Sequence, residues 1–301
     1  MSTLKKRLST AVGTGIVGTA LMLFPALVGA QGLDTAKIDA ALGRSGQKTG
    51  DVYRVAFPRT DLHVTVGDVV IRPGLALGSW AAFSGSDQNA MVMGDLVLLP
   101  TELNPVIMKL RSSGFEITSV HNHLMGETPQ LVYAHYHGHG PAADIAKSLK
   151  AALAESKTPL ETPPGAPAAG ETPAFVKTIN DTLGTSGRWA GGVLAFGIPR
   201  ADAITDMGAT LTTPQGVAES ISFQDAGGGN VATTGDFVMT ADEVNSVISA
   251  LEDHKIEVTA LHSHLLTEQP RLFFMHFWGV GTPESVSQGI KAALGKIKTK
   301  Q

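Results

Sequence analysis

The chain has 301 residues, with 27 acidic and 23 basic residues, ten histidines and no cysteine. The lack of cysteine excludes disulfides and thiolate ligands, so a metal site can be built only from His, Glu and Asp. The first 30 residues hold three basic and no acidic residues. The remaining chain has 20 basic and 27 acidic residues, and this net charge of −7 disfavours nucleic acid and anionic lipid as partners.

The N-terminus predicts an export signal. Lys5, Lys6 and Arg7 form a basic region, and the apolar stretch 11–27 is shorter than the roughly 20 residues that span a bilayer. Small residues then predict cleavage after Ala30, with an uncleaved anchor as the alternative. We therefore expect a periplasmic or secreted protein with no stable membrane insertion after signal removal.

The rest of the sequence is a tandem duplication with an offset of 141 residues (262 minus 121). The offset aligns Pro58-Arg59-x-Asp61 with Pro199-Arg200-x-Asp202, and it aligns further anchors such as Gly94/Gly235 and Pro73/Pro214 without a gap. A run rich in Pro and Ala separates the copies and predicts a semi-rigid linker. The predicted boundaries are a signal peptide at 1–30, a first repeat domain at 31–156, a linker at 157–172 and a second repeat domain at 173–301.

Each copy predicts the same order of elements. In the first copy, these are a helix at 35–42, strands at 52–57, 62–71, 75–83 and 91–98, a helix at 102–110, strands at 116–123 and 130–137, and a helix that begins at Pro141. Gly43 and Gly184 are predicted to end the first helix of their copies. Gly94-Asp95 is predicted to fix a turn, and Glu102 to start a helix. The order predicts an α+β fold with two tandem homologous domains, each an antiparallel sheet with flanking helices.

Six of the ten histidines lie in two copies of the pattern H-x-H-x3-E-x-P-x-L-x3-H, at 121–135 and 262–276. Histidines two apart on a strand point to one face, and the returning strand brings the third histidine opposite them. Three imidazoles with an open position are a common catalytic ligand set for zinc. We therefore predict a divalent metal in each repeat, zinc first, with copper, manganese, iron and nickel also open. The predicted ligands are His121, His123 and His135, and His262, His264 and His276.

Other residues carry weaker predictions. Glu127 and Glu268 follow the H-x-H pairs and are predicted to act as base or as a fourth ligand. Two Arg-x-Asp pairs are predicted to form structural salt bridges, with orientation of a ligand histidine or binding of substrate as the alternative; they are Arg59 and Asp61, and Arg200 and Asp202. The alternative for the ligand histidines is a polar cap at the sheet edge or a hydrogen-bonded core group. Among the remaining histidines, a solvated loop is predicted for His137 and His139, and the surface for His63 and His254.

The motifs VHNHL at 120–124 and LHSHL at 261–265, each followed by E-x-P and H-x-x-G-x-G, resemble the LppY/LpqO-like exported bacterial proteins, a family with a domain of unknown function. The resemblance covers nearly the whole mature chain and implies export and fold, but no reaction. The mycobacterial members resemble lipoproteins, whereas this chain has no cysteine to lipidate. H-x-H-x3-E also resembles half of the cupin motif, but the third histidine follows too closely here.

The leading hypothesis is a metal-dependent enzyme, a hydrolase, that acts on an unidentified small molecule or envelope component. The alternatives are a periplasmic metal carrier or sensor, and a structural envelope protein with no metal. An enzyme is expected to have a cleft with an open coordination position, and a carrier a shallow, exposed site. A further hypothesis pairs the copies about a pseudo-twofold axis, with both sites facing one shared groove.

Overall fold

The computed structural model describes residues 32–161 and 171–300, and these belong to one compact unit, Gly32–Gln301. The predicted signal peptide, its cleavage after Ala30 and most of the predicted linker lie outside the described residues. Within the described ranges, every helix is too short or too polar to cross a membrane.

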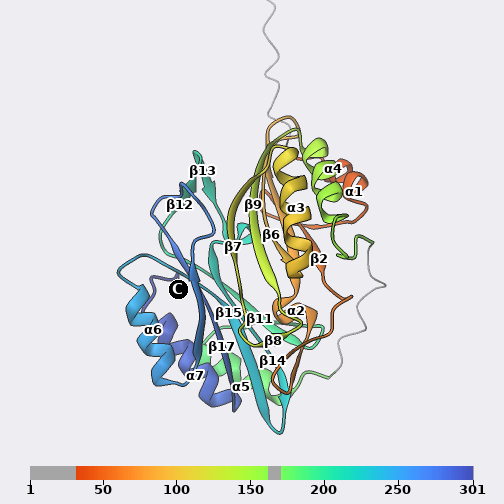
Figure 1. Ribbon diagram of the computed structural model, residues 1–301. Coiled ribbons are helices and arrows are strands. Elements are labelled where there is room, and N and C mark those ends of the chain that lie inside the picture. The colour runs from red at the N-terminus through yellow and green to blue at the C-terminus, as the bar shows by residue number, and fades with distance from the viewer. Residues whose placement is uncertain (1–31, 162–170, 301) are drawn as a thin grey trace, which may run out of the picture. The chain divides into compact units, whose positions relative to one another are not determined.

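Each repeat contributes one six-stranded antiparallel sheet (Figure 1). The first repeat consists of α1 (Thr35–Leu42), β1 (Gln47–Thr49), β2 (Val52–Pro58), β3 (Val64–Val66), β4 (Val69–Ile71), α2 (Pro73–Ala76), β5 (Gly78–Gly85), β6 (Ala90–Leu98), α3 (Pro100–Ser112), β7 (Glu116–His121), β8 (Glu127–Thr128), β9 (Val132–Gly140) and α4 (Ala142–Leu153). The strand order in its large sheet is β1-β2-β5-β6-β9-β7. The short strands β4-β3-β8 form a separate sheet.

The second repeat repeats this topology. It consists of α5 (Ala174–Leu183), β10 (Arg188–Ala190), β11 (Val193–Pro199), β12 (Ile204–Asp206), β13 (Ala209–Leu211), the 3₁₀ turn η1 (Thr213–Gln215), β14 (Ala218–Gly227), β15 (Asn230–Met239), α6 (Val244–Asp253), β16 (Glu257–His262), β17 (Phe273–Gly281) and α7 (Pro283–Leu294). Its large sheet has the order β10-β11-β14-β15-β17-β16. The α+β fold and the duplication predicted from the sequence are thus confirmed.

Helices cover one face of each sheet (Figure 1). In the first repeat, the apolar sides of α1, α3 and α4 pack on inward-facing strand residues such as Val55, Phe83 and Leu96. The second repeat builds the same core from α5, α6 and α7 on its own sheet. Gly43 and Gly184 end α1 and α5 in the left-handed conformation, as predicted, because glycine adopts a positive φ without a Cβ clash.

The opposite faces of the two sheets pack against each other. One apolar cluster joins Met91 and Met93 of the first repeat to Ile204 and Leu211, which belong to the β12–β13 hairpin of the second. A second cluster joins Val64 and other residues near the β3–β4 hairpin to residues of the second sheet, including Val193 and Trp278. Each repeat therefore extends a hairpin over the sheet of the other repeat, and the two share their buried apolar surface.

Three sequence predictions are wrong in detail. The strand predicted at 62–71 is a hairpin, because Gly67 takes a positive φ between β3 and β4. Residues 75–76 belong to the helical turn α2 rather than to a strand. The predicted turn at Gly94-Asp95 is the middle of β6, whose residues are all buried. The prediction for Glu102 is confirmed, since it lies in the first turn of α3 and accepts the Leu99 N–H at 2.9 Å.

The repeat offset is also not constant. Tyr53 pairs with Phe83 across β2 and β5, and Leu194 pairs with Phe223 across β11 and β14. Phe83 and Phe223 are therefore equivalent positions at an offset of 140. The hairpin between β14 and β15, which carries a register shift near Gly227, restores the offset of 141. Between these points, residues aligned by sequence are one position away from their structural equivalents.

Candidate metal centre

Four of the six predicted ligand histidines lie on strands at the contact between the sheets. His123 and His264 lie just beyond the ends of β7 and β16, so the strand predicted at 116–123 ends at His121. His121 and His262 end β7 and β16, and His135 and His276 lie within β9 and β17. Ser119 pairs with His135 in the register of β7 and β9, so the H-x-H motif continues alongside the strand that carries the third histidine. The predicted convergence of each triad follows from this pairing.

The structure brings the two triads together. The rings lie against each other in pairs across the repeats, with centroid separations of 3.7 Å for His121–His262, 3.7 Å for His123–His276 and 3.8 Å for His135–His264. The first and third pairs are stacked, and the rings of His123 and His276 are inclined by 31°. Two groups of histidines offer ligand atoms that all lie within 4.8 Å of one another; they are His121, His262, His264 and His276, and His121, His123 and His135. The sequence predicted a separate site in each repeat, whereas His121 joins ligand groups from both.

Two aspartates adjoin the histidine cluster, and the sequence analysis did not assign them to it. Asp95 Oδ2 lies 3.4 Å from His123 Nε2, and Asp95 Oδ1 lies 3.8 Å from His135 Nε2. In the second repeat, Asp236 lies 3.2 Å from His264 and 3.9 Å from His276. Asp95 pairs with His135 in the register of β6 and β9, so both side chains share one face of the sheet.

The cluster contains many buried polar atoms that make no hydrogen bond. Within the described part of the chain, the Nε2 atoms of all six histidines and the Oδ1 atoms of both aspartates are buried and make no hydrogen bond. Leaving a buried polar group unpaired costs about 1–3 kcal/mol, so such groups are rare unless something binds them. Unpaired imidazole nitrogens beside carboxylates are the donor set that a divalent transition metal uses.

Burial sets the charge of the cluster. Desolvation is the main cause that lowers the pKa of every histidine in it, to about 4 for His262 and about 3 for His276, with neighbouring imidazoles adding to the effect at most of them. The neutral imidazole is the form that binds metal. Burial likewise raises the pKa of Asp95 to about 7, and it raises that of Asp236, to which the charge of Asp95 adds. A bound cation would favour the ionised carboxylates again.

Backbone contacts orient the rings. His276 donates its Nδ1 hydrogen to the Gly235 carbonyl oxygen at 2.8 Å, which leaves the Nε2 lone pair free. A Cβ at Gly235 would lie 2.0 Å from the Ser220 carbonyl oxygen, and one at Gly94 would lie 2.2 Å from that of Trp80. The Gly-Asp dipeptide thus combines close strand packing with a carboxylate that faces the histidines.

Contacts between the repeats hold the two H-x-H segments side by side. Asn122 donates to the Thr259 carbonyl oxygen at 3.0 Å, and the Thr259 hydroxyl donates to the His123 carbonyl oxygen at 2.6 Å. Tyr133 stacks on His123 with centroids 3.4 Å apart, and Phe274 stacks on His264 at 3.6 Å. These contacts fix both motifs in place, although they come from opposite halves of the chain.

The cluster borders a cavity of about 540 Å³. Both repeats line it, with residues from β2 and β5 on one side and from β11, β14 and β15 on the other. Asp95, Asp236 and four of the six histidines form part of its wall. A small molecule in this cavity would contact the same groups that can hold a metal.

The predicted base residues have contacts of their own within the loops. Glu127 is buried and accepts the Leu131 N–H at 3.0 Å. Glu268 is also buried, accepts the Leu272 N–H at 3.0 Å and pairs with Arg271 at 3.2 Å. Neither glutamate is among the residues that offer clustered ligand atoms. Their catalytic role therefore stays a prediction. In both copies the glutamate also accepts the N–H of the residue four positions later, and this contact stabilises the loop.

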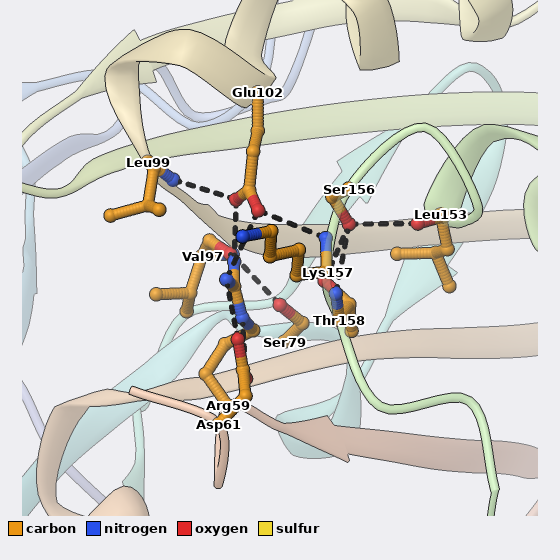
Figure 2. A network of polar contacts seen from close by, with 10 residues as sticks. All are labelled: Arg59, Asp61, Ser79, Val97, Leu99, Glu102, Leu153, Ser156, Lys157 and Thr158. Atoms are coloured by element: carbon orange, nitrogen blue, oxygen red, sulfur yellow. Dashed lines mark hydrogen bonds and ion pairs between the residues drawn. The ribbon is translucent and has the colours of Figure 1, made fainter. Parts of the chain in front are cut away.

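Each Arg-x-Asp pair lies in a polar network of its own, and Figure 2 shows the network of Arg59 and Asp61. Arg59 is fully buried, and its guanidinium makes five hydrogen bonds to the Asp61 and Glu102 carboxylates and the Val97 carbonyl oxygen. Arg200 makes the corresponding contacts with Asp202, Glu243 and the Val238 carbonyl oxygen. Among the described residues, these partners belong to the starts of α3 and α6 and to strand ends, and they include no histidine.

Of the other histidines, His63 and His254 are exposed as predicted. The solvated loop predicted for His137 and His139 is wrong, since both lie on β9 and His137 is only 2% exposed. His137 Nδ1 lies 3.6 Å from Asp206 of the second repeat. The third histidine of the first triad, His135, is thus followed by His137 and His139 along the same strand, β9.

The comparisons place the chain in a family. The model described as Domain of Unknown Function (DUF1259) matches residues 36–155 and 177–296. The chain belongs to this family and carries its domain twice. No curated protein matches the chain.

Two solved structures are similar to the chain at low levels. One, a trimeric bacterial microcompartment shell protein PduB, is 12% identical, with 84% of this chain and 89% of that chain covered and a TM-score of 0.20. The other, crystal form I of TP0453, is 12% identical, with 87% and 98% covered and a TM-score of 0.18. TM-scores this low carry no inference about either fold or function.

Proposed function

We propose that the chain is a metal-dependent enzyme, a hydrolase, with one metal centre that both repeats share. The observation that carries this proposal is the set of six buried Nε2 atoms and two buried Oδ1 atoms that have no hydrogen-bond partner among the described residues. A packed histidine core or a polar sheet edge does not account for so many unpaired polar atoms in one place, because each would destabilise the fold.

The pseudo-symmetric arrangement suggests how the ligands divide. His123, His135 and Asp95 would serve one ion, and His264, His276 and Asp236 a second, with His121 and His262 between them. Zinc fits a set rich in neutral imidazole, and copper, manganese, iron and nickel use the same donors. Such an ion supplies Lewis-acid catalysis at a carbonyl or phosphoryl oxygen.

Burial favours an enzyme over a carrier. A carrier must release its metal to a partner and is expected to hold it at a shallow, exposed site. Here His135, His264 and His276 are each less than 8% exposed, and the cluster borders a cavity of small-molecule size. Export, with residues 1–30 as the signal, is part of the proposal, and the resemblance to LppY/LpqO-like exported proteins supports it.

The decisive experiment measures metal content and hydrolysis on the same samples. The full chain is purified beside His123→Ala/His264→Ala, and beside His63→Ala/His254→Ala as a control that removes two exposed histidines. We expect elemental analysis to find the same metal in the wild type and the control, and little in the cluster variant. Chromogenic esters, lactones and phosphoesters would then be screened, and a chelator should abolish turnover until the metal is restored.

Two results would contradict the proposal. If the wild type retains no metal and its melting temperature does not respond to zinc, copper or manganese, there is no metal centre. If a metal is bound in stoichiometric amount but no chelator-sensitive hydrolysis occurs across the screen, the hydrolase assignment fails and the carrier takes its place.

A further inference from the structure

The cavity beside the metal centre has a cation, Arg54, that other residues hold in place. Arg54, on β2, lines the cavity together with Asp95, and the Arg54 Cζ atom lies 3.9 Å from the centroid of the Trp80 ring. Its Nη1 donates to the Pro214 carbonyl oxygen of the second repeat at 2.8 Å. Burial lowers the pKa of Arg54 to about 10, so the guanidinium is still protonated at neutral pH.

These contacts hold the guanidinium without saturating it. Stacking on Trp80 fixes its plane, and the bond to Pro214 fixes its rotation. A guanidinium has five N–H donors, and within the described residues Pro214 supplies the only hydrogen-bond acceptor for that of Arg54. Arg59 provides a contrast inside the same chain, since its side chain makes five hydrogen bonds to protein oxygens. Arg54 thus keeps a donor edge for a ligand.

The second repeat forms the same strands without this pair. Ala195 stands at the position equivalent to Arg54, and Ser220 pairs with Asp236 as Trp80 pairs with Asp95. The same strands therefore form without an arginine or a tryptophan there. Ala195 and Ser220 also line the cavity, so its two sides differ in charge and in shape. The one other cavity-lining cation, Arg188, is exposed.

We propose that the cavity binds a small organic anion whose oxyanion group pairs with Arg54 while the rest of the molecule reaches the metal centre. This inference rests on the proposed function and names its substrate class. The volume of about 540 Å³ is that of a small-molecule site. A planar guanidinium suits carboxylate and phosphoryl groups alike, because both accept two parallel N–H bonds. The Trp80 ring gives the apolar part of the molecule a surface to pack on.

The experiment titrates the full chain, zinc-loaded and metal-free, with benzoate, inorganic phosphate and the neutral analogue benzamide by calorimetry. We expect benzoate or phosphate to bind and benzamide not to bind. Binding by benzoate identifies a carboxylate ligand, and binding by phosphate a phosphoryl ligand. In Arg54→Gln the affinity should fall at least about tenfold, Arg54→Lys should keep part of it, and the exposed Lys147→Gln should change nothing.

A second variant guards against misfolding of Arg54→Gln. Gly78 lines the cavity and is exposed, and a Cβ there would meet no atom within 4 Å, so we expect Gly78→Leu to extend its side chain into the cavity. It should fold with an unchanged melting temperature and lose anion binding. Anion affinity that is equal in the wild type, Arg54→Gln and Gly78→Leu, or no binding of either anion to the wild type, would overturn the inference.

Metal content, measured on each sample, separates the two proposals. Arg54→Gln should keep the metal of the wild type. If the wild type holds no metal but binds the anion through Arg54, the metal-enzyme proposal fails and the anion site stands. If metal is bound and anion binding does not depend on Arg54, the anion site fails and the metal centre stands.

Discussion

The rings of His121 and His262 lie face to face, with centroids 3.7 Å apart and planes inclined by 20°. The two residues occupy the same position in the two repeats, at the ends of β7 and β16. His121 also belongs to both groups of clustered ligand atoms. The duplication therefore builds one centre from two halves, and the halves are expected to depend on each other.

The first prediction concerns this dependence. In His121→Ala/His123→Ala/His135→Ala, the second triad remains but loses its partner rings and the ligand His121. We expect zinc affinity at the remaining ligands to fall at least about tenfold, because residues in contact do not act additively. Calorimetry with elemental analysis measures this, and the mirror variant His262→Ala/His264→Ala/His276→Ala should behave alike. Half the wild-type metal, held with unchanged affinity, would instead indicate two independent sites.

The second prediction concerns the two aspartates. Asp95→Asn and Asp236→Asn each remove a buried carboxylate that faces two histidines. Metal affinity should fall by about 10–100-fold, as is typical when a ligand or its immediate partner is lost. Without metal, the melting temperature should stay equal or rise, since burial already disfavours these charges. A metal affinity unchanged in both variants would exclude the carboxylates from the centre.

The third prediction is a dependence of stability on pH. Burial lowers the pKa values of the cluster histidines, so in the metal-free native state they stay neutral while the unfolded chain takes up protons below about pH 6.5. Their contribution is therefore lost as pH falls from about 6.5 towards 4. The raised pKa values of Asp95 and Asp236 act in the opposite direction over part of this range. Because six histidines contribute to the loss and only two aspartates oppose it, the metal-free fold should become less stable as the pH falls.

Thermal unfolding of the metal-free chain measures this dependence. The melting temperature should fall by at least about 5 °C between pH 7 and pH 5. The variant His63→Asn/His254→Asn, which alters exposed histidines only, should follow the wild-type curve. A flat curve in the wild type would mean that the cluster histidines are not buried in their neutral form.

The fourth prediction tests the role of the Arg59 network. Arg59→Met leaves the Glu102 carboxylate buried beside an apolar chain, which should cost about 3–5 kcal/mol in the free energy of unfolding. Urea titration measures this loss. Lys147→Met, which removes one partner of an exposed pair with Asp144, should have little effect. The folded fraction of Arg59→Met should keep the zinc affinity of the wild type. A lower zinc affinity would mean that Arg59 contributes to the metal centre.

Much of the fold could be predicted because the helices and strands depend on local sequence patterns. The helix at 35–42, its glycine cap and the paired strands around each histidine triad follow from periodicity and capping. The hairpin at Gly67 was missed because alternation continues through it and one glycine gives a weak signal. The assignment of His137 to a loop failed because glycines on either side of His139 are typical of turns, while β9 tolerates them.

The candidate site was predicted in part. The two triads are visible as a repeated spacing, but their mutual contact depends on how the sheets pack, which no local pattern encodes. Asp95 and Asp236 had a usable signal, namely a charged residue repeated inside an apolar strand, although the flanking glycine suggested a turn. Arg54 had no such sequence signal, because the second repeat has no arginine at the equivalent position.

The unequal walls of the cavity have a consequence for the orientation of a bound ligand. The histidines and aspartates form a nearly two-fold symmetric set, but Arg54 and Trp80 stand on one side only, opposite Ala195 and Ser220. A ligand anchored at Arg54 could meet the centre in just one of the two orientations that symmetric walls would permit. The protein would then present one defined end of its substrate to the metal centre, even though the duplication began with two identical halves.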